Sequence, residues 1–170
     1  GSFAPWVGAL IADIKQPILL VTEPGREEEA VTRLSRVGFD NTLGYLEGGF
    51  EAWKKASKEY DVVSSVTAPE FKNELSKDNT PVFDVRKESE HSSEHVMDAT
   101  NTPLDFLNDH LAEFPEEPFF LHCAGGYRSM IASSILKSRG IHNVIDVKGG
   151  FKAIKEAGVT VSEFVCPSTL

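Results

Sequence analysis

Apolar and polar positions alternate in two ways along the chain. A short apolar run at residues 118–121 is followed by a glycine turn and by a stretch in which Ile131 and Ile135 lie at helical spacing. This stretch ends near Gly140, a typical helix stop, and a second apolar run, NVIDV, comes next. Strands and helices in this order predict parallel strands joined by right-handed crossovers, with helices over the faces of the sheet.

The same pattern occurs earlier in the chain. Shifting the sequence on itself by about one hundred residues places 17–56 over 118–157, with Gly49 over Gly150. Each copy has the order strand, turn, helix, strand, helix. The first copy offers two strands and at most three helices, too few to bury both faces of a sheet alone. We therefore expect an α/β three-layer sandwich with a mostly parallel central sheet of about five strands, preceded by a partial second copy.

The residues between the two copies complete the predicted sheet. They supply these expected elements: a strand at 62–66, a helix capped by Thr67, a strand at 81–85, a short strand at 99–101 and a helix at 104–111. The resulting organisation is a partial domain at 1–59, a complete domain at 60–160 and a tail at 161–170. The first copy has no cysteine at the position of Cys123, and its loop TEPGR is one residue shorter than CAGGYR, so we expect it to be non-catalytic.

Charge and composition narrow the classes of partner. The net charge of -9 argues against a nucleic acid as the main partner, and no basic block indicates binding to a membrane surface. The apolar runs are far shorter than the about 20 residues that cross a bilayer, and no signal peptide opens the sequence. The two cysteines, Cys123 and Cys166, form no disulfide framework. A cytoplasmic protein with at least one free thiol is expected.

Cys123 carries the candidate chemistry. It directly follows a predicted buried strand and precedes a helix, so it should lie at the carboxyl edge of the sheet, where open α/β folds bind ligands. Gly125 and Gly126 let the backbone turn its N–H groups inward, and the helix dipole and Arg128 add positive charge. Such a loop binds anions and favours a cysteine thiolate.

A cysteine in this position can also be an inert buried side chain. The first copy bears on this alternative, because it has the helix, an arginine and both glycine turns but no cysteine. Thr22 stands in the place of Cys123 by strand register, and Val21 by helix register. The fold therefore does not require the cysteine, which favours a chemical role for Cys123.

The motifs of the second copy resemble those of rhodanese domains. They are Asp84-Val85-Arg86, His95, Asn101-Thr102-Pro103-Leu104, the loop from Cys123 to Arg128, and Gly149-Gly150. The chain as a whole looks like a tandem pair of such domains, an inactive partial copy and then an active one. Two residues depart from the family pattern: Ile154 replaces a common tryptophan, and Met97 a common glycine. The order of the copies also resembles proteins that join a metallo-β-lactamase-fold domain to rhodanese domains, which implies such a domain upstream.

The resemblance implies a rhodanese-type sulfurtransferase without a cofactor or metal. Cys123 would take sulfane sulfur from thiosulfate or a low-molecular-weight persulfide and pass it to a thiol or cyanide. Arg128 would be catalytic with Cys123 by binding the anionic part of the donor. The residues expected to bind the substrate or the terminal sulfur are Ala124, Gly125, Gly126, Tyr127 and Ser129.

Three other interpretations stay open. A non-catalytic rhodanese module could bind partners or sense oxidants through Cys123. Phosphatases and arsenate reductases of related topology are disfavoured, because phosphatases of this type have five residues between cysteine and arginine and here there are four. The motif HSSEH at 91–95 matches a zinc pattern, but the surrounding residues have no apolar helical face. We expect a solvated connection there, with His95 in a structural hydrogen bond.

Overall fold

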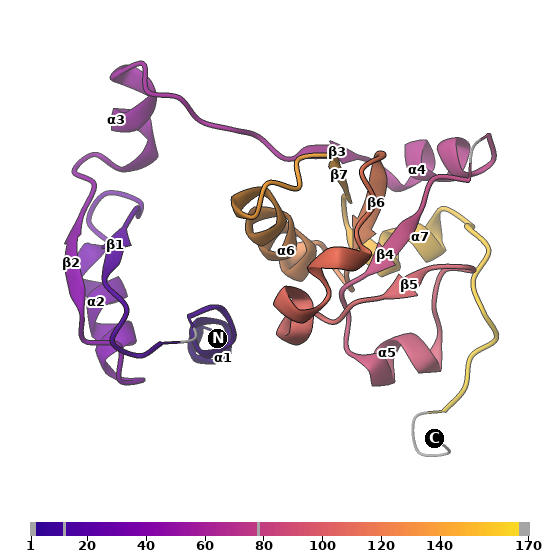
Figure 1. The fold of residues 1–170 in the computed structure, drawn as a ribbon, viewed down its shortest axis with the longest axis horizontal. Coiled ribbons are helices and arrows are strands. Elements are labelled where there is room, and N and C mark those ends of the chain that lie inside the picture. Colours follow the sequence, from indigo (N-terminus) through magenta and orange to yellow (C-terminus); the bar gives the residue numbers. More distant parts are fainter. Residues whose placement is uncertain (1–2, 12, 78, 167–170) are drawn as a thin grey trace. The chain divides into compact units, whose positions relative to one another are not determined.

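The chain forms two compact units in the computed structural model, which describes residues 3–11, 13–77 and 79–166. The first unit comprises Gly1–Asp61 and the second Val62–Leu170. Figure 1 shows the elements of both units. The predicted boundaries at 59/60 and 160/161 stay predictions, and the proposed site lies wholly within the second unit.

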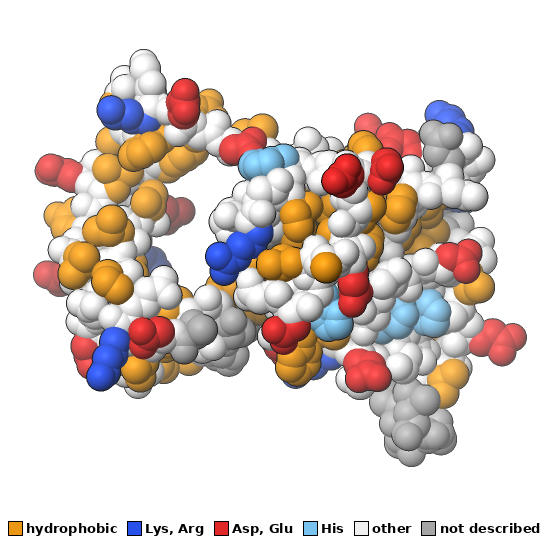
Figure 2. Space-filling model, in the orientation of Figure 1, with side chains coloured by type: hydrophobic (Ala, Val, Ile, Leu, Met, Phe, Trp, Pro, Cys, Tyr) orange, Lys and Arg blue, Asp and Glu red, His pale blue; other side chains and the backbone are white. Residues whose placement is uncertain are grey.

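The first unit has two parallel strands and three helices. These are α1 (Phe3–Leu10), β1 (Ile18–Leu20), α2 (Glu27–Ser35), β2 (Thr42–Tyr45) and α3 (Gly49–Lys55). Val7, Leu34 and Phe39 form its small buried cluster. Leu19, Leu43 and Tyr45 remain exposed, Leu19 by 75%. Figure 2 shows apolar side chains on the surface of this unit. As the sequence predicts, two strands and three helices do not bury both faces of a sheet.

The second unit is an α/β sandwich around a five-stranded parallel sheet with the order β3-β7-β6-β4-β5. Its elements are β3 (Ser64–Val66), α4 (Ala68–Leu75), β4 (Val82–Asp84), α5 (Glu88–Ser93), β5 (Thr100–Asn101), η1 (Leu104–Asp109), η2 (Leu111–Glu113), β6 (Phe119–His122), α6 (Tyr127–Ser138), β7 (Val144–Val147) and α7 (Gly150–Glu156). This architecture confirms the predicted fold class.

Strand β6 is buried along its whole length because it lies at the centre of the sheet with helices on both faces. On one face Phe120 packs edge-on against Phe71 of α4, with ring centroids 4.9 Å apart. On the other face Phe119 packs against Phe83 and Phe114. Figure 1 shows α6 on one side of the sheet and α4 and α7 on the other. A rigid central strand therefore carries Cys123 at its end.

Local signals in the sequence account for α4. The Thr67 hydroxyl accepts from the Glu70 N–H, and the Glu70 carboxylate accepts from the Thr67 N–H, which together form a capping box. Hydrogen bonding from Thr67 lowers the pKa of Glu70. The prediction of a helix capped by Thr67 is confirmed.

Two predicted segments differ from the structure. Residues 104–111 form short 3-10 helices, η1 and η2, instead of one regular helix. Residues 88–93 form α5, where we expected a solvated connection. Helix α5 needs no broad apolar face, because the Glu90 carboxylate accepts from the Lys87 N–H at its start and pairs with Arg128. Polar tertiary contacts replace the missing apolar periodicity.

The turn before β5 corrects one sequence assignment. We expected Met97 to occupy the position at which relatives commonly have glycine. The left-handed backbone conformation instead falls on Asp98, with φ of 61°. Residue 98 is therefore the position where glycine would relieve backbone strain.

No helix of the described residues has the length and apolar character needed to span a bilayer.

Candidate active site

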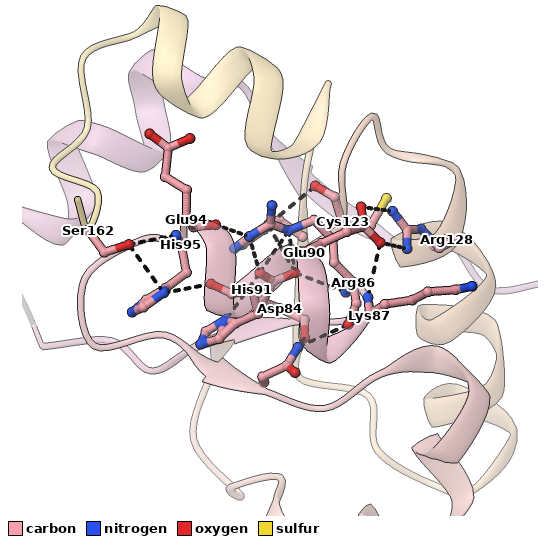
Figure 3. Close-up of polar contacts among 12 residues, drawn as sticks. Asp84, Arg86, Lys87, Glu90, His91, Glu94, His95, Cys123, Arg128 and Ser162 are labelled. Carbon is pink, nitrogen blue, oxygen red and sulfur yellow. Dashed lines mark hydrogen bonds and ion pairs between the residues drawn. The ribbon is translucent and has the colours of Figure 1, made fainter. Parts of the chain in front are cut away.

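The loop after β6 places the sulfur of Cys123 at the start of a helix. Cys123 is a free cysteine and is only 1% exposed. The Gly126 N–H donates to Cys123 Sγ over 3.1 Å. Gly126 has φ of 96° and immediately precedes α6, so its left-handed conformation turns the chain back toward the sulfur. Figure 3 shows the sulfur in its polar surroundings.

The opposite side of the loop is held by the start of α7. The Phe151 N–H donates to the Cys123 carbonyl over 2.6 Å, and the Lys152 N–H donates to the Ala124 carbonyl over 3.2 Å. These bonds engage the loop's carbonyl oxygens away from the sulfur. These carbonyl oxygens, the negative ends of the peptide dipoles, therefore face N–H groups of α7. The sulfur itself accepts a hydrogen bond from the Gly126 N–H.

Arg128 pairs with a glutamate that the sequence prediction did not include. Its two terminal nitrogens donate to the two carboxylate oxygens of Glu90 over 2.6 and 2.8 Å. This bidentate hydrogen bonding raises the pKa of Arg128 and lowers that of Glu90. The positive charge expected to bind a donor anion is therefore matched by a carboxylate in the same pair (Figure 3).

The other predicted site residues surround the loop to different degrees. Gly125 is exposed and Ala124 is half-buried. Tyr127 is 66% exposed. The Ser129 side chain is fully buried, and its hydroxyl donates to the Gly126 carbonyl over 3.3 Å. The structure thus brings Cys123, Gly126 and Ser129 into one connected turn.

A buried polar network lies at the end of β4, the strand next to β6. The Arg86 guanidinium makes a bidentate pair with the fully buried Asp84 and stacks on the Phe151 ring, 3.9 Å from its centroid. Burial would raise the pKa of Asp84, but His122 and Arg86 outweigh it and hold that pKa below its usual value. Asn101 donates to the carbonyls of Asp84 and Arg86. These contacts fix the neighbouring strand end.

His91 and His95 make contacts unlike those of a metal site. Their rings stack with centroids 4.1 Å apart. Nδ1 of His95 lies 2.8 Å from the His91 carbonyl and 3.3 Å from the Ser162 hydroxyl, which confirms a structural hydrogen bond. The described residues contain no group of three or more ligating side chains able to hold a metal ion.

The first unit repeats the glycine contact of the site without its cysteine. Gly150 and Gly49 both begin a helix with positive φ, 58° and 59°. An ideal Cβ on Gly150 would lie 2.4 Å from the Cys123 carbonyl oxygen, and one on Gly49 would lie 2.5 Å from the Thr22 carbonyl oxygen. Thr22, rather than Val21, is therefore the counterpart of Cys123 in this contact.

Sequence reasoning missed Glu90, Asp84 and Phe151 as partners of the loop. No local signal marked Glu90, because Lys87, three residues before it, is not a residue type that forms a capping box. Its pairing with Arg128 spans 38 residues and follows only from the packing of α5 beside the loop.

Comparisons with known proteins place this site in a family. Residues 67–157 match the rhodanese-like domain family. The uncharacterized protein YqhL of Bacillus subtilis is 30% identical over 92 residues, which cover 54% of this chain and 71% of YqhL. A rhodanese-like domain protein from Staphylococcus aureus has a TM-score of 0.53 and 28% identity, covering 59% of this chain and all of that one.

A longer alignment concerns the fold alone. The thiosulfate sulfurtransferase of Pseudomonas aeruginosa is 22% identical, with a TM-score of 0.52. The alignment covers 96% of this chain but only 36% of that protein. With the family match covering more than half of the residues, the loop geometry and the five-stranded parallel sheet have one common explanation: the chain belongs to the rhodanese-like family.

Proposed function

We propose that the second unit is a rhodanese-type sulfurtransferase that carries sulfane sulfur on Cys123. The observation that carries the proposal is the Gly126 N–H, 3.1 Å from Cys123 Sγ at the start of α6. A fixed peptide donor and a helix N-terminus stabilise negative charge on sulfur in the attacking thiolate and in the resulting persulfide.

The reaction has two halves. The Cys123 thiolate attacks the outer sulfur of the donor, a new bond forms between Sγ and that sulfur, and the donor's S–S bond breaks. The leaving group is sulfite when thiosulfate is the donor, and a thiolate when a persulfide is the donor. In the second half an acceptor thiol or cyanide attacks the terminal sulfur and Cys123 leaves as thiolate. No external oxidant or reductant is consumed.

Loop geometry supports sulfur over phosphate as the transferred group. The four residues between Cys123 and Arg128 close a short turn, and Gly126, within that turn, already donates to the sulfur itself. Arg128 is paired with Glu90 and so has less capacity to bind a phosphate ester. Turnover of an aryl phosphate or of arsenate by the purified protein would contradict this choice.

We also propose that the first unit is a non-catalytic partial copy of the same domain. Thr22 occupies the contact that Cys123 makes with the following glycine helix. A hydroxyl there cannot form a persulfide. A fusion to an upstream metallo-β-lactamase-fold domain stays a prediction from the order of the two copies.

The test is intact-protein mass spectrometry after incubation with thiosulfate and, separately, with glutathione persulfide. We expect a gain of one sulfur atom that cyanide removes as thiocyanate, which distinguishes sulfur from two added oxygens. Cys123→Ser should abolish the gain, whereas Cys166→Ser, at the other cysteine, which is exposed, should keep it.

One observation favours a second candidate, a binding or redox-sensing module. Cys123 is 1% exposed, so a donor must reach a sulfur that is almost closed off. If neither donor adds sulfur while Cys123 still reacts with an alkylating reagent, the sulfurtransferase proposal is wrong and the sensing module is supported.

A further inference from the structure

Glu90 and Arg128 form a sheltered ion pair beside the reactive cysteine. The Arg128 side chain is 18% exposed and the Glu90 side chain 35%, and both terminal nitrogens of the guanidinium are engaged. Glu90 is also held by the Lys87 N–H at the start of α5. The carboxylate is therefore fixed from two sides, one of them the cation that would otherwise bind an anionic donor.

Arg86, the second arginine near the loop, is also paired with a carboxylate. Arg86 is 4% exposed, and its guanidinium pairs with the buried Asp84. Each arginine thus has its own carboxylate, and the two pairs add no net charge. Lys148 and Lys152 flank the start of α7, which contacts the loop. Both are exposed to water, which screens their charge.

A cavity of about 270 Å³ runs along the same glutamate. Its lining is Arg86, Ser89, Glu90, Ser93, Glu94, Phe151 and Phe164. The cavity is connected to the loop through Glu90, which pairs with Arg128, and through Phe151, whose N–H donates to the Cys123 carbonyl. A donor body in this cavity would lie beside the Glu90 carboxylate.

We propose that Glu90 determines donor specificity by offsetting the charge of Arg128, so that the site disfavours dianionic sulfur donors relative to persulfides. The inference rests on the proposed function. Thiosulfate carries two negative charges, shared between its sulfonate oxygens and the reacting outer sulfur, and must bring both near Glu90. Glutathione persulfide carries its carboxylates and amine away from its sulfur pair, so the same carboxylate opposes it less.

Both donors load Cys123 by the balanced steps given above. They differ only in the leaving group, sulfite or glutathione thiolate. Glu90 acts on approach of the donor and does not touch the reacting sulfur, so its effect should appear in KM more than in kcat.

The test compares wild type, Glu90→Gln and Glu88→Gln in the rate of persulfide formation on Cys123. Gln at residue 90 keeps an oxygen for the Lys87 N–H but removes the charge. Glu88 lies in the same helix and is exposed, so its variant removes an equal charge that does not pair with Arg128. Thiosulfate and glutathione persulfide are the two probes.

We expect Glu90→Gln to raise kcat/KM for thiosulfate about tenfold or more and to change kcat/KM for glutathione persulfide less than about threefold. Glu88→Gln should change neither by more than about twofold. The ratio between donors is the decisive readout, since any general damage to the loop lowers both rates together.

An unchanged donor ratio in Glu90→Gln, or an equal change in Glu88→Gln, would overturn the inference while leaving the sulfurtransferase proposal intact. If Glu90→Gln does not fold, the ratio of kcat/KM for the two donors in the wild type tests the inference. A wild-type preference for thiosulfate over glutathione persulfide would contradict the role of Glu90. Absence of loading with both donors would instead contradict the proposed function itself.

Discussion

Gly150 approaches the backbone of Cys123 so closely that residue 150 has no room for a side chain. An ideal Cβ there would lie 2.4 Å from the Cys123 carbonyl oxygen and 2.8 Å from the backbone of Ala124 and Gly125. The contact allows the Phe151 N–H to reach the same carbonyl. The shape of the loop around Cys123 thus depends on a glycine that is distant from it in sequence.

Replacing Gly150 by alanine should therefore damage the loop beyond ordinary backbone strain. We expect Gly150→Ala to lose about 2–4 kcal/mol of unfolding free energy and at least about tenfold in persulfide formation. Gly140→Ala is the matched control, because Gly140 also has positive φ, 88°, but nothing lies within 4 Å of its added Cβ. The control should lose about 1 kcal/mol and keep its activity. Equal losses in both variants, by urea denaturation and mass spectrometry, would contradict the steric explanation.

Arg86 should be far more important for stability than a surface cation. Arg86→Met leaves the Asp84 carboxylate buried without its bidentate partner, and we expect a loss of about 3–5 kcal/mol. Lys155→Met breaks the exposed pair with Glu94 and should cost about 0–1 kcal/mol. Urea denaturation followed by circular dichroism checks both values. A loss below about 1 kcal/mol for Arg86→Met would mean that water reaches Asp84.

The loop itself was predictable because its chemistry is local. A cysteine after an apolar strand, two glycines and an arginine at the start of a helix lie within six consecutive residues, Cys123 to Arg128. If the first unit is a partial copy of the second, as proposed, Thr22 stands at the position of Cys123 and the fold does not require the cysteine. The parallel sheet followed from the alternation of apolar runs and helical stretches.

Glu90 was not predictable in the same way, because its role depends on packing across 38 residues. The segment around it lacks an apolar period, so periodicity indicated a connection where polar contacts in fact hold α5. The positive φ of Asp98 was not predicted, because an aspartate in the sequence does not mark that conformation as a glycine would.

Asp146 should reduce stability at neutral pH. It is 2% exposed, its Oδ1 has no hydrogen-bond partner among the described residues, and burial raises its pKa above the ordinary value. The folded state therefore favours the protonated acid, and stability is lost as pH rises above about 4. We expect Asp146→Asn to raise the free energy of unfolding at pH 7 on the order of 1 kcal/mol.

The gain should shrink toward pH 4, because the raised pKa of Asp146 makes its carboxyl protonated in a larger fraction of folded than of unfolded molecules. Asp105→Asn, at an exposed position of η1, should change stability little at either pH. Urea titrations at the two pH values measure both variants. A gain for Asp146→Asn that is the same at pH 4 and pH 7 would exclude ionisation as its cause.

His122 should make the fold sensitive to mild acid. Its side chain is fully buried, and burial lowers its pKa below the ordinary value, although Asp84 and the Cys123 carbonyl oppose the shift. Burial also lowers the pKa of His91. As pH falls below about 6.5, the unfolded chain takes up protons at these two positions more readily than the folded chain does. The free energy of unfolding should therefore fall below that pH, by up to about 1.4 kcal/mol per pH unit for each such group.

Replacing His122 by glutamine removes one of these groups and should flatten the decline between pH 7 and pH 5 without abolishing it, since His91 remains. His142→Gln, at an exposed position, is the control for the replacement of a histidine by glutamine. The measurement is urea denaturation at half-unit steps of pH.

At lower pH the free energy of unfolding should fall further, because the pKa values of Asp84 and Glu90 are lowered in the folded state. A wild-type slope of zero above pH 5 would show that His122 is protonated in the folded protein and that its burial is incomplete.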